Sequence, residues 1–550
     1  MSASSKKKLR KELNAAAMTE KQLQEAKEAK KLSLYTTIFG IAIAAMILVV
    51  IVSRIFSGGM IPRSTTALTV GDSKISAAEL NHYYIDSVNS FLNQAGEYIS
   101  LFGLDTTKAL DEQFYNEAEE QTWADYFLEQ ATTSAKNMYA LYNAAKAEGC
   151  TLSDEAKASI DSTVDSMKLN ATLYGFPSAD AYITAMYGEG CNEETFRAYA
   201  EVQMLAQEYA VAKNESLVYD EAALRAEDEA NPASYSAFSY NYCYLTPAKF
   251  YEGGTKDENG NVTYSDAEKE AGRAAAEAAA NTLAACTTVE ELDAAFAALP
   301  FNAEVESAKS VRQDKIQYAN VTTAIRDWVT AADRKAGDIA VIPSESTTHN
   351  HAEGEECTGD DGTTVVNGYY VVLFDSMDKN LTELVNVRHI LVSYEGGTTD
   401  QNTGVTTYTD KEKQLAKSKA DEILASFNAG EKTEEAFAAL ATEKTTDPGS
   451  KENGGLYENV YPGQMVTAFN DWCFDAARKT GDTAIVETEY GCHVMYFVGN
   501  AGMTYRDLMI ESTLRTNDLT AWESELIEAA EMVLGNTKYI RSDLVLQSGN

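Results

Sequence analysis

The segment VNVRHILVSYEGGTTDQNTGVTTYTDKEKQ, residues 385–414, has a second, related version elsewhere in the chain. Residues 241–270 read NYCYLTPAKFYEGGTKDENGNVTYSDAEKE. The likeness extends further, since IRDWVTAADRKAGDIAVI at 325–342 matches FNDWCFDAARKTGDTAIV at 469–486. We therefore expect one module to occur twice.

The later copy, residues 386–500, predicts a compact α+β domain. VNVRHILVSY alternates and is β-branched, as strands are, and DKEKQLAKSKADEILASFNAG is an amphipathic helix ended by Gly430. A short helix, TEEAFAALA, and a Gly-rich loop, TTDPGSKENGGLYENVYPG, follow. QMVTAFNDWCFDAARKTG then reads as helical, and DTAIVETEY and CHVMYFVG read as strands. Helices and strands in this order indicate one small mixed domain.

The N-terminus predicts a membrane anchor. Residues 34–52, LYTTIFGIAIAAMILVVIV, are apolar and uncharged, and nineteen residues span a bilayer core as a helix. A cleaved signal peptide is the alternative, but its apolar core is shorter and no small-x-small site follows. Nine basic residues before residue 32 favour a cytoplasmic tail and an exported body.

Charge and cysteine content exclude several classes of protein. With 84 acidic against 45 basic residues, the net charge is −39, which opposes nucleic-acid binding. The seven cysteines show no paired spacing and no zinc pattern, so we expect isolated, mostly buried thiols.

Residues 65–235 predict a helical domain. Ser76-Ala77-Ala78-Glu79 is a capping box, and CNEETFRAYAEVQMLAQEYAVA has apolar residues at helical spacing. The order of TALTVGDSKISAAEL, LSDEAKASIDS and GFPSADAYITAMYGEGCNEETFRAYAEVQML resembles the chaperone region of PrsA/SurA-type foldases. That resemblance implies a helical cradle for non-native chains. It also implies that a late helix, DLTAWESELIEAAEMVLGNTK at 518–538, packs on the cradle.

The later copy resembles the parvulin (PpiC-type) peptidyl-prolyl isomerase domain over about 115 residues. The motifs, in the family's order, are Val387-Arg388-His389-Ile390-Leu391-Val392, Asp447, Gly454-Gly455-Leu456, Gly463-Gln464-Met465-Val466 with Phe469, and Thr488-Glu489-Tyr490-Gly491-Cys492-His493.

The resemblance implies a site, residue by residue. The catalytic set would be His389, Asp447, Thr488, Tyr490 and His493, and the substrate-binding set would be Leu456, Gln464, Met465 and Phe469. Met465 and Phe469 are four residues apart on a predicted helix, so both side chains would face the same way. The resemblance implies that they line the pocket for the proline ring. The loop reads Gly-Gly-Leu-Tyr-Glu where the family has Gly-Gly-Asp-Leu-Gly. The resemblance therefore does not determine which residues of this loop form the pocket wall.

Parvulin chemistry implies no cofactor and no metal. An Xaa-Pro bond rotates over a barrier of about 18–20 kcal/mol, and a dry apolar site that favours the twisted amide lowers it. Asp447 stands where some parvulins carry a cysteine, which argues against nucleophilic attack. The loop YEGGTTDQNTG holds no Lys or Arg, so it lacks the cations that a phosphate-directed parvulin needs.

The earlier copy is expected to lack activity. Aligned with the later one, it carries Cys243 in place of His389, Tyr370 in place of His493 and Ile325 in place of Phe469, with Asn320-Val321 near Gln464-Met465. Its insertion at 344–368 contains His349, His351 and acidic residues, which could bind a metal or could be an acidic surface loop.

The sequence thus predicts an α+β multidomain protein with an N-terminal transmembrane helix. The predicted parts are a basic tail (1–33), an anchor (34–53), a helical chaperone domain (65–235), a degenerate parvulin-like domain (236–380), a parvulin domain (386–500) and a C-terminal helical segment (501–550). We expect a single-pass, extracytoplasmic isomerase and foldase for unfolded exported proteins. The alternatives are a non-catalytic holdase and a cell-surface assembly or adhesion protein.

Overall fold

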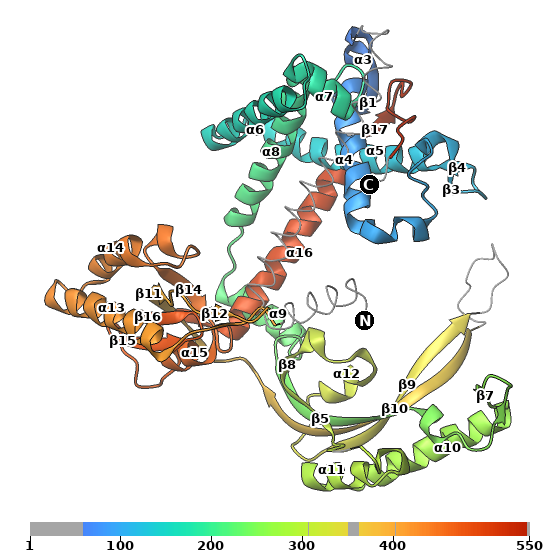
Figure 1. Ribbon diagram of the computed structural model, residues 1–550, viewed down its shortest axis with the longest axis vertical. Helices are drawn as coiled ribbons and strands as arrows, with labels where there is room; N and C mark the ends of the chain where they lie inside the picture. Colours follow the sequence, from blue (N-terminus) through green and yellow to red (C-terminus); the bar gives the residue numbers. More distant parts are fainter. Residues whose placement is uncertain (1–58, 306, 350–361, 402, 547–550) are drawn as a thin grey trace. The chain divides into compact units, whose positions relative to one another are not determined.

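A computed structural model describes residues 59–305, 307–349, 362–401 and 403–546. The chain is a mixture of helices and antiparallel sheets that divides into two units (Figure 1). The first comprises residues up to 218, 399–406 and 515 onward, and the second comprises 219–398 and 407–514. Within the described ranges, none of the helices combines the length and apolar character that a membrane span requires. The predicted tail and anchor lie outside these ranges.

The first unit is mainly helical. Its elements are α3 (Met60–Ser64), β1 (Thr66–Val70), β2 (Ser73–Ser76), α4 (Ala77–Ala95), η1 (Gly96–Phe102), η2 (Leu110–Glu112), β3 (Phe114–Asn116), β4 (Gln121–Thr122), α5 (Trp123–Ala147), α6 (Asp154–Leu173), α7 (Ala179–Tyr187), α8 (Glu193–Ser216) and β17 (Met532–Leu534). The predicted capping box starts α4, where Ser76 accepts a hydrogen bond from the Glu79 amide. Trp123, Tyr84 and Phe127 are among its fully buried side chains.

The C-terminal helix is α16 (Tyr505–Ala529), which ends earlier than the expected helix at 518–538. Beyond it, β17 pairs antiparallel with β1, with Leu534 opposite Leu68. Gly535 allows the chain to come this close to β1, because a Cβ there would lie 2.4 Å from the Thr66 carbonyl oxygen. Close backbone pairing with β1 therefore replaces the last helical turns. In the first unit, Trp522 of α16 packs on Tyr209 of α8, with ring centroids 5.2 Å apart.

The second unit contains two sheets built alike, after α9 (Glu221–Ala230). The first repeat consists of β5 (Ala237–Leu245), η3 (Pro247–Phe250), β6 (Thr255–Lys256), β7 (Val262–Thr263), α10 (Asp266–Leu283), α11 (Val289–Ala297), η4 (Pro300–Asn302), β8 (Val311–Gln317), η5 (Tyr318–Asn320), α12 (Thr323–Val329), β9 (Ile339–His349) and β10 (Gly362–Asp378). The second repeat consists of β11 (Glu383–Ser393), β12 (Thr398–Thr399), β13 (Thr406–Thr407), α13 (Asp410–Ala429), α14 (Glu434–Lys444), η6 (Lys451–Asn453), β14 (Leu456–Val460), α15 (Thr467–Cys473), β15 (Thr483–Thr488) and β16 (Gly491–Thr504).

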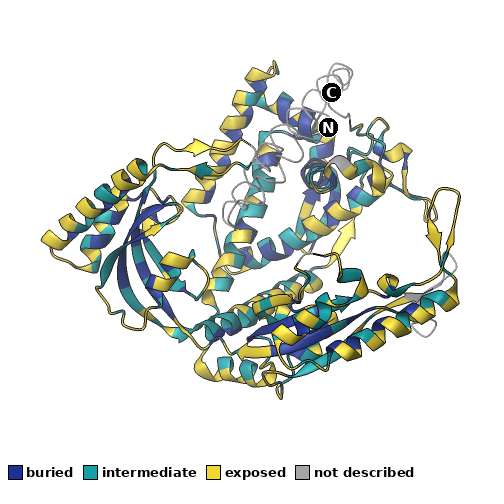
Figure 2. Ribbon diagram, turned by 60° about the horizontal axis from the view of Figure 1, so that its bottom comes forward, coloured by how far each residue is buried: buried dark blue, intermediate teal, exposed yellow. Residues whose placement is uncertain are grey.

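Strand order is the same in both repeats. The first sheet runs β8-β5-β10-β9 and the second β14-β11-β16-β15, with every pairing antiparallel. Buried residues follow the strands of both sheets (Figure 2). In the second repeat, α13 and α14 cover one face through Phe427 and Phe437, and α15 packs on the other face through Phe469.

Two features of the second repeat differ from the sequence prediction. The Gly-rich loop contains an edge strand, β14, which pairs with β11. The segment 464–481, expected to be helical throughout, is helical only from Thr467 to Cys473. Arg478 accounts for the early end, because its guanidinium stacks on Trp472 at 4.2 Å and its Nε donates to the Trp472 carbonyl oxygen at 3.0 Å.

Candidate active site

Two neighbouring central strands bring His389 and His493 together. His389 lies on β11 and His493 on β16, and in the register of the pair Leu391 is opposite His493 and Met495 is opposite His389. Both histidines face the side of the sheet that carries α15. Their Nδ1 atoms lie 3.0 Å apart, and the rings are 3% and 5% exposed. The pair is thus a buried contact between strands.

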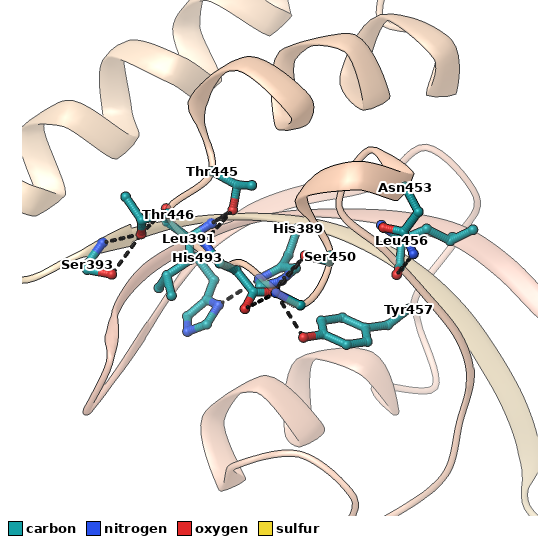
Figure 3. A network of polar contacts seen from close by, with 12 residues as sticks. His389, Leu391, Ser393, Thr445, Thr446, Ser450, Asn453, Leu456, Tyr457 and His493 are labelled. Atoms are coloured by element: carbon teal, nitrogen blue, oxygen red, sulfur yellow. Dashed lines mark hydrogen bonds and ion pairs between the residues drawn. The ribbon is translucent and has the colours of Figure 1, made fainter. Parts of the chain in front are cut away.

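Asp447 closes one end of the pair, beside the Ser450 and Tyr457 side chains that Figure 3 labels. Its Oδ2 lies 3.0 Å from His389 Nε2 and accepts hydrogen bonds from Ser450 Oγ at 2.6 Å and Tyr457 OH at 2.9 Å. Burial alone would raise the pKa of Asp447. The hydrogen bonds from His389, Ser450 and Tyr457, with the charge interaction with His389, outweigh burial and hold that pKa well below its usual range. Asp447 is therefore a buried carboxylate.

Thr488 closes the other end. Its Oγ1 lies 2.9 Å from His493 Nε2 and also accepts from the Tyr490 amide at 3.2 Å. Burial, followed by the neighbouring His389, lowers the pKa of His493 to about 3, although the charge of Asp447 opposes this. His493 is therefore neutral at physiological pH.

The contacts define a direction for the chain of hydrogen bonds. A carboxylate only accepts, so His389 Nε2 carries a proton and donates to Asp447. When His389 is neutral, its Nδ1 accepts from His493 Nδ1–H, and His493 Nε2 accepts from the Thr488 hydroxyl. Protonation of His389 would reverse the last two bonds. The site is thus one connected polar line under the sheet face.

An apolar wall stands beside this line. Phe469 meets both imidazoles edge-on, with centroids 5.6 Å from His389 and 5.4 Å from His493. Met465 and Tyr457 pack into the same cluster. Met465 lies in the turn before α15, not on the helix as expected, because α15 begins at Thr467. It nevertheless reaches the cluster that holds Phe469.

Leu456 and Gln464 are placed differently from the expected substrate-binding set. Successive residues of β14 face opposite sides of the sheet, so Tyr457 joins the cluster around Phe469 whereas Leu456 does not. In Figure 3 the Tyr457 side chain extends toward the group that contains His389 and Ser450, whereas the Leu456 side chain extends away from that group. The exposed Gln464 binds its own turn, where its Oε1 accepts from the Tyr461 amide at 3.1 Å. The third wall of the site is Tyr457.

Gly455 explains how the loop comes so close. Its φ of +75° is in the left-handed region, and a Cβ there would lie 2.3 Å from the His389 carbonyl oxygen. The His389 amide donates to the Gly455 carbonyl oxygen at 2.8 Å, and the Gly455 amide donates to Ser450 O at 2.7 Å. The Gly-Gly pair therefore lets the loop bring Ser450 and Tyr457 to Asp447.

The expected site residues are thus brought together unequally. His389, Asp447, Thr488 and His493 form one line, Met465 and Phe469 line it, and Tyr490 contributes its backbone amide. Ser450 and Tyr457 were not anticipated. Neither residue had a signal of its own, because the segment that contains β14 was expected to be a loop. A cavity of about 450 Å³ opens beside Thr488, between the start of α15 and the end of β15.

The first repeat carries tyrosines where the second carries histidines. Phe374 in the first repeat and Phe497 in the second make the same backbone contact. The Phe374 amide donates to the Asp338 carbonyl oxygen at 2.8 Å, and the Phe497 amide donates to the Asp482 carbonyl oxygen at 2.9 Å. This makes Phe374 equivalent to Phe497, and the strand registers then place Tyr370 at the position of His493.

The same registers place Tyr242, not Cys243, at the position of His389. Cys243 packs on the opposite face with Leu245 and Ala276, so the expected pairing of Cys243 with His389 is wrong by one residue. The shared Tyr-Glu-Gly-Gly cannot fix this register, because the turn η3 separates it from β5, and an alignment through that motif would place Thr246 at the position of His389. The rings of Tyr242 and Tyr370 are 5.7 Å apart.

Among the described residues, no group of three or more His, Cys, Asp or Glu side chains is placed so that it could bind a metal ion. Most of the loop considered for metal binding, 350–361, lies outside those residues. The six described cysteines are all free.

Comparison with known proteins agrees with this geometry. Residues 372–500 match the family model of the PPIC-type PPIase domain. This part of the chain is a parvulin-type peptidyl-prolyl isomerase domain.

The chain is also similar to PrsA foldases. It is 31% identical over 121 residues to foldase protein PrsA 1 of Listeria monocytogenes serotype 4b, covering 20% of this chain and 40% of that protein. It is 38% identical over 77 residues to PrsA 2 of Listeria monocytogenes serovar 1/2a, covering 14% and 25%. A solved structure of PrsA from Bacillus subtilis matches with 26% identity over 27% of this chain and 48% of that chain, with a TM-score of 0.18. The chain thus spans less than half the length of these curated relatives.

Proposed function

We propose that the chain is a membrane-anchored, extracytoplasmic foldase whose second repeat, residues 386–500, isomerises Xaa-Pro bonds of exported proteins that have not yet folded. The observation that carries this proposal is the unbroken polar line from Tyr457 and Asp447 through His389 and His493 to Thr488, beside the apolar wall of Phe469 and Met465.

The arrangement suits bond rotation and needs no cofactor. Phe469, Met465 and Tyr457 would grip the proline ring in a site that excludes water. The planar amide loses its resonance at the midpoint of rotation, so a site that fits the twisted form better lowers the barrier. The histidine pair, held by Asp447 and Thr488, gives the floor of this site a fixed polarity. Each 1.4 kcal/mol of preference for the twisted amide is worth about tenfold in rate.

The other parts would support this activity. In our proposal the anchor at 34–53 holds the body outside the membrane, and the helical domain at 65–235, with the segment 501–550, shields apolar stretches of clients. The first repeat, 236–380, would be parvulin-like and silent, because tyrosines replace both histidines and Ile325 replaces Phe469. Phosphorylated clients are not favoured, since 394–404 lacks Lys and Arg.

The test is refolding of a denatured protein whose slow phase is limited by proline isomerisation. We expect the full chain to accelerate that phase and to suppress aggregation, and His389→Ala to lose the acceleration while still suppressing aggregation. The alternative, a non-catalytic holdase, requires that the full chain suppress aggregation and leave the rate of the slow phase unchanged.

A further inference from the structure

We infer that Tyr457 is a positioning residue of the isomerase site, which fixes the carboxylate of Asp447 and through it the orientation of His389. This inference rests on the proposed function of the second repeat. It starts from a departure of the sequence, since Tyr457 stands in the Gly-Gly-Leu-Tyr-Glu loop where the parvulin pattern has leucine after Gly-Gly-Asp.

Three polar groups converge on one oxygen of Asp447, Oδ2. His389 Nε2, Ser450 Oγ and Tyr457 OH all lie within 3.0 Å of Oδ2. Asp447 is 6% exposed, so these groups replace the water that a carboxylate would otherwise bind. Removing one donor leaves the buried charge less well compensated.

Tyr457 is suited to be a permanent donor. Burial, followed by the charge of Asp447, raises the pKa of Tyr457 far above its usual range, so the hydroxyl keeps its proton. Its ring also lies 5.1 Å from the His389 ring and packs with Phe469. The ring therefore limits the tilt of His389, while the hydroxyl fixes the group that accepts its proton.

The test compares Tyr457→Phe, which keeps the ring, with Tyr496→Phe. Tyr496 is 5% exposed on β16 and packs with the helices on the other face of the sheet. We expect Tyr457→Phe in the full chain to lower kcat about tenfold on Xaa-Pro peptides. In the pH profile of kcat, the acid limb of Tyr457→Phe should move to higher pH, because Asp447 loses a hydrogen-bond donor that lowers its pKa. Tyr496→Phe should change neither.

A spectroscopic readout separates this inference from the proposed function. The imidazole ¹⁵N signals of His389 report which ring nitrogen carries the proton, whether or not the protein turns over a peptide. We expect Tyr457→Phe to shift them and Tyr496→Phe to leave them as in the wild type. Unchanged His389 signals in Tyr457→Phe would overturn the positioning role. A shift without any wild-type isomerisation would overturn the proposed function alone.

An independent observation in the first unit supports a second proposal. Five large apolar side chains between residues 98 and 115 are exposed, namely Tyr98 (66%), Leu101 (78%), Phe102 (56%), Phe114 (52%) and Tyr115 (47%). Phe102 contacts Phe91 with centroids 5.5 Å apart, and Tyr115 stacks on Tyr126 at 4.3 Å. Phe91 and Tyr126 are themselves 6.3 Å apart, so ring contacts connect Phe102 with Tyr115. Exposed apolar groups gathered in this way mark interaction sites.

The charge of the same segment selects the partner. Asp111, Glu112, Glu117, Glu119 and Glu120 are exposed, and the single basic residue between 75 and 135, Lys108, is paired with Asp105 at 3.3 Å. We propose that residues 98–120, the aromatic-acidic patch, dock an extended polypeptide segment in which apolar side chains alternate with Lys or Arg. The aromatic rings of the patch would bind the apolar side chains of the peptide, and its acidic residues would bind the Lys or Arg side chains.

The patch is tested by titrating the full chain with a labelled unfolded peptide of alternating Leu and Lys, and with its Glu counterpart. We expect the Lys peptide to bind and the Glu peptide to bind at least tenfold more weakly. Leu101→Ser with Phe102→Ser should weaken binding by at least tenfold. The matched control, Leu169→Ser with Leu173→Ser, changes side chains that are 69% and 72% exposed on α6 and should have no effect. Equal affinity of the two peptides, absent binding, or no effect of the patch variant would overturn the proposal.

Discussion

The Nδ1 atoms of His389 and His493 lie 3.0 Å apart across β11 and β16, with both rings buried. At that distance one nitrogen donates and the other accepts, so the protonation of either ring fixes that of its neighbour. Asp447 and Thr488 terminate the pair. The consequences of this coupling can be measured.

The protonation of His493 should make the second repeat sensitive to acid. Its folded pKa is about 3, below the usual value of about 6.5, so between these values the unfolded chain binds a proton that the folded chain excludes. Stability from this group is complete above about pH 6.5 and falls by up to about 1.4 kcal/mol per pH unit down to pH 3. An NMR titration should find the His493 ring neutral at pH 5. A midpoint near 6.5 would contradict the burial of this ring.

Asp447→Asn should lower isomerase activity at least tenfold. The Asn amide has the shape of the carboxylate but not its negative charge, which strengthens the hydrogen bonds that Asp447 accepts from His389, Ser450 and Tyr457. The exposed Asp471→Asn on α15 is the control and should keep the wild-type rate. Equal rates of Asp447→Asn and wild type would remove Asp447 from the site.

Gly455→Ala should destabilise the second repeat by about 2 kcal/mol or more, because the new Cβ meets the His389 carbonyl oxygen and the left-handed backbone is strained. At Gly463 the φ is +85° and no atom lies within 4 Å of the place that a Cβ would take, so Gly463→Ala carries the backbone strain alone. In urea unfolding, the midpoint concentration of Gly455→Ala should be well below that of Gly463→Ala. Equal midpoints would show that the close approach has no energetic weight.

Cys473→Ala should leave the rate of isomerisation within about twofold of the wild type. Burial raises the pKa of this thiol to about 12, although Arg478 opposes the shift, so the thiolate needed for attack is absent at neutral pH. Iodoacetamide should accordingly label Cys473 in the native protein far more slowly than after unfolding. A large loss of rate in Cys473→Ala, with stability retained, would point to covalent chemistry.

The sequence predicted much of the site because its residues lie in contiguous motifs. The strand pattern of 385–394, the cap of α4 and the histidines of the second repeat could all be recognised locally. Tyr457 was missed because its role depends on β14 pairing with β11, a contact that local periodicity does not contain. Likewise the equivalence of Tyr242 with His389 depends on cross-strand register, which the turn η3 obscured. The ending of α16 required knowledge that β1 offers a free edge.

We propose that catalysis belongs to the second repeat and depends on the histidine line and its apolar wall. The most direct measurement is the cis-to-trans isomerisation of a short Xaa-Pro peptide by the full chain, followed by NMR exchange. We predict acceleration by the wild type and by Tyr370→Phe in the first repeat, and at least a tenfold loss in His389→Ala and Phe469→Ala. Full activity in both of those variants, or a wild type no faster than the uncatalysed reaction, would contradict this proposal.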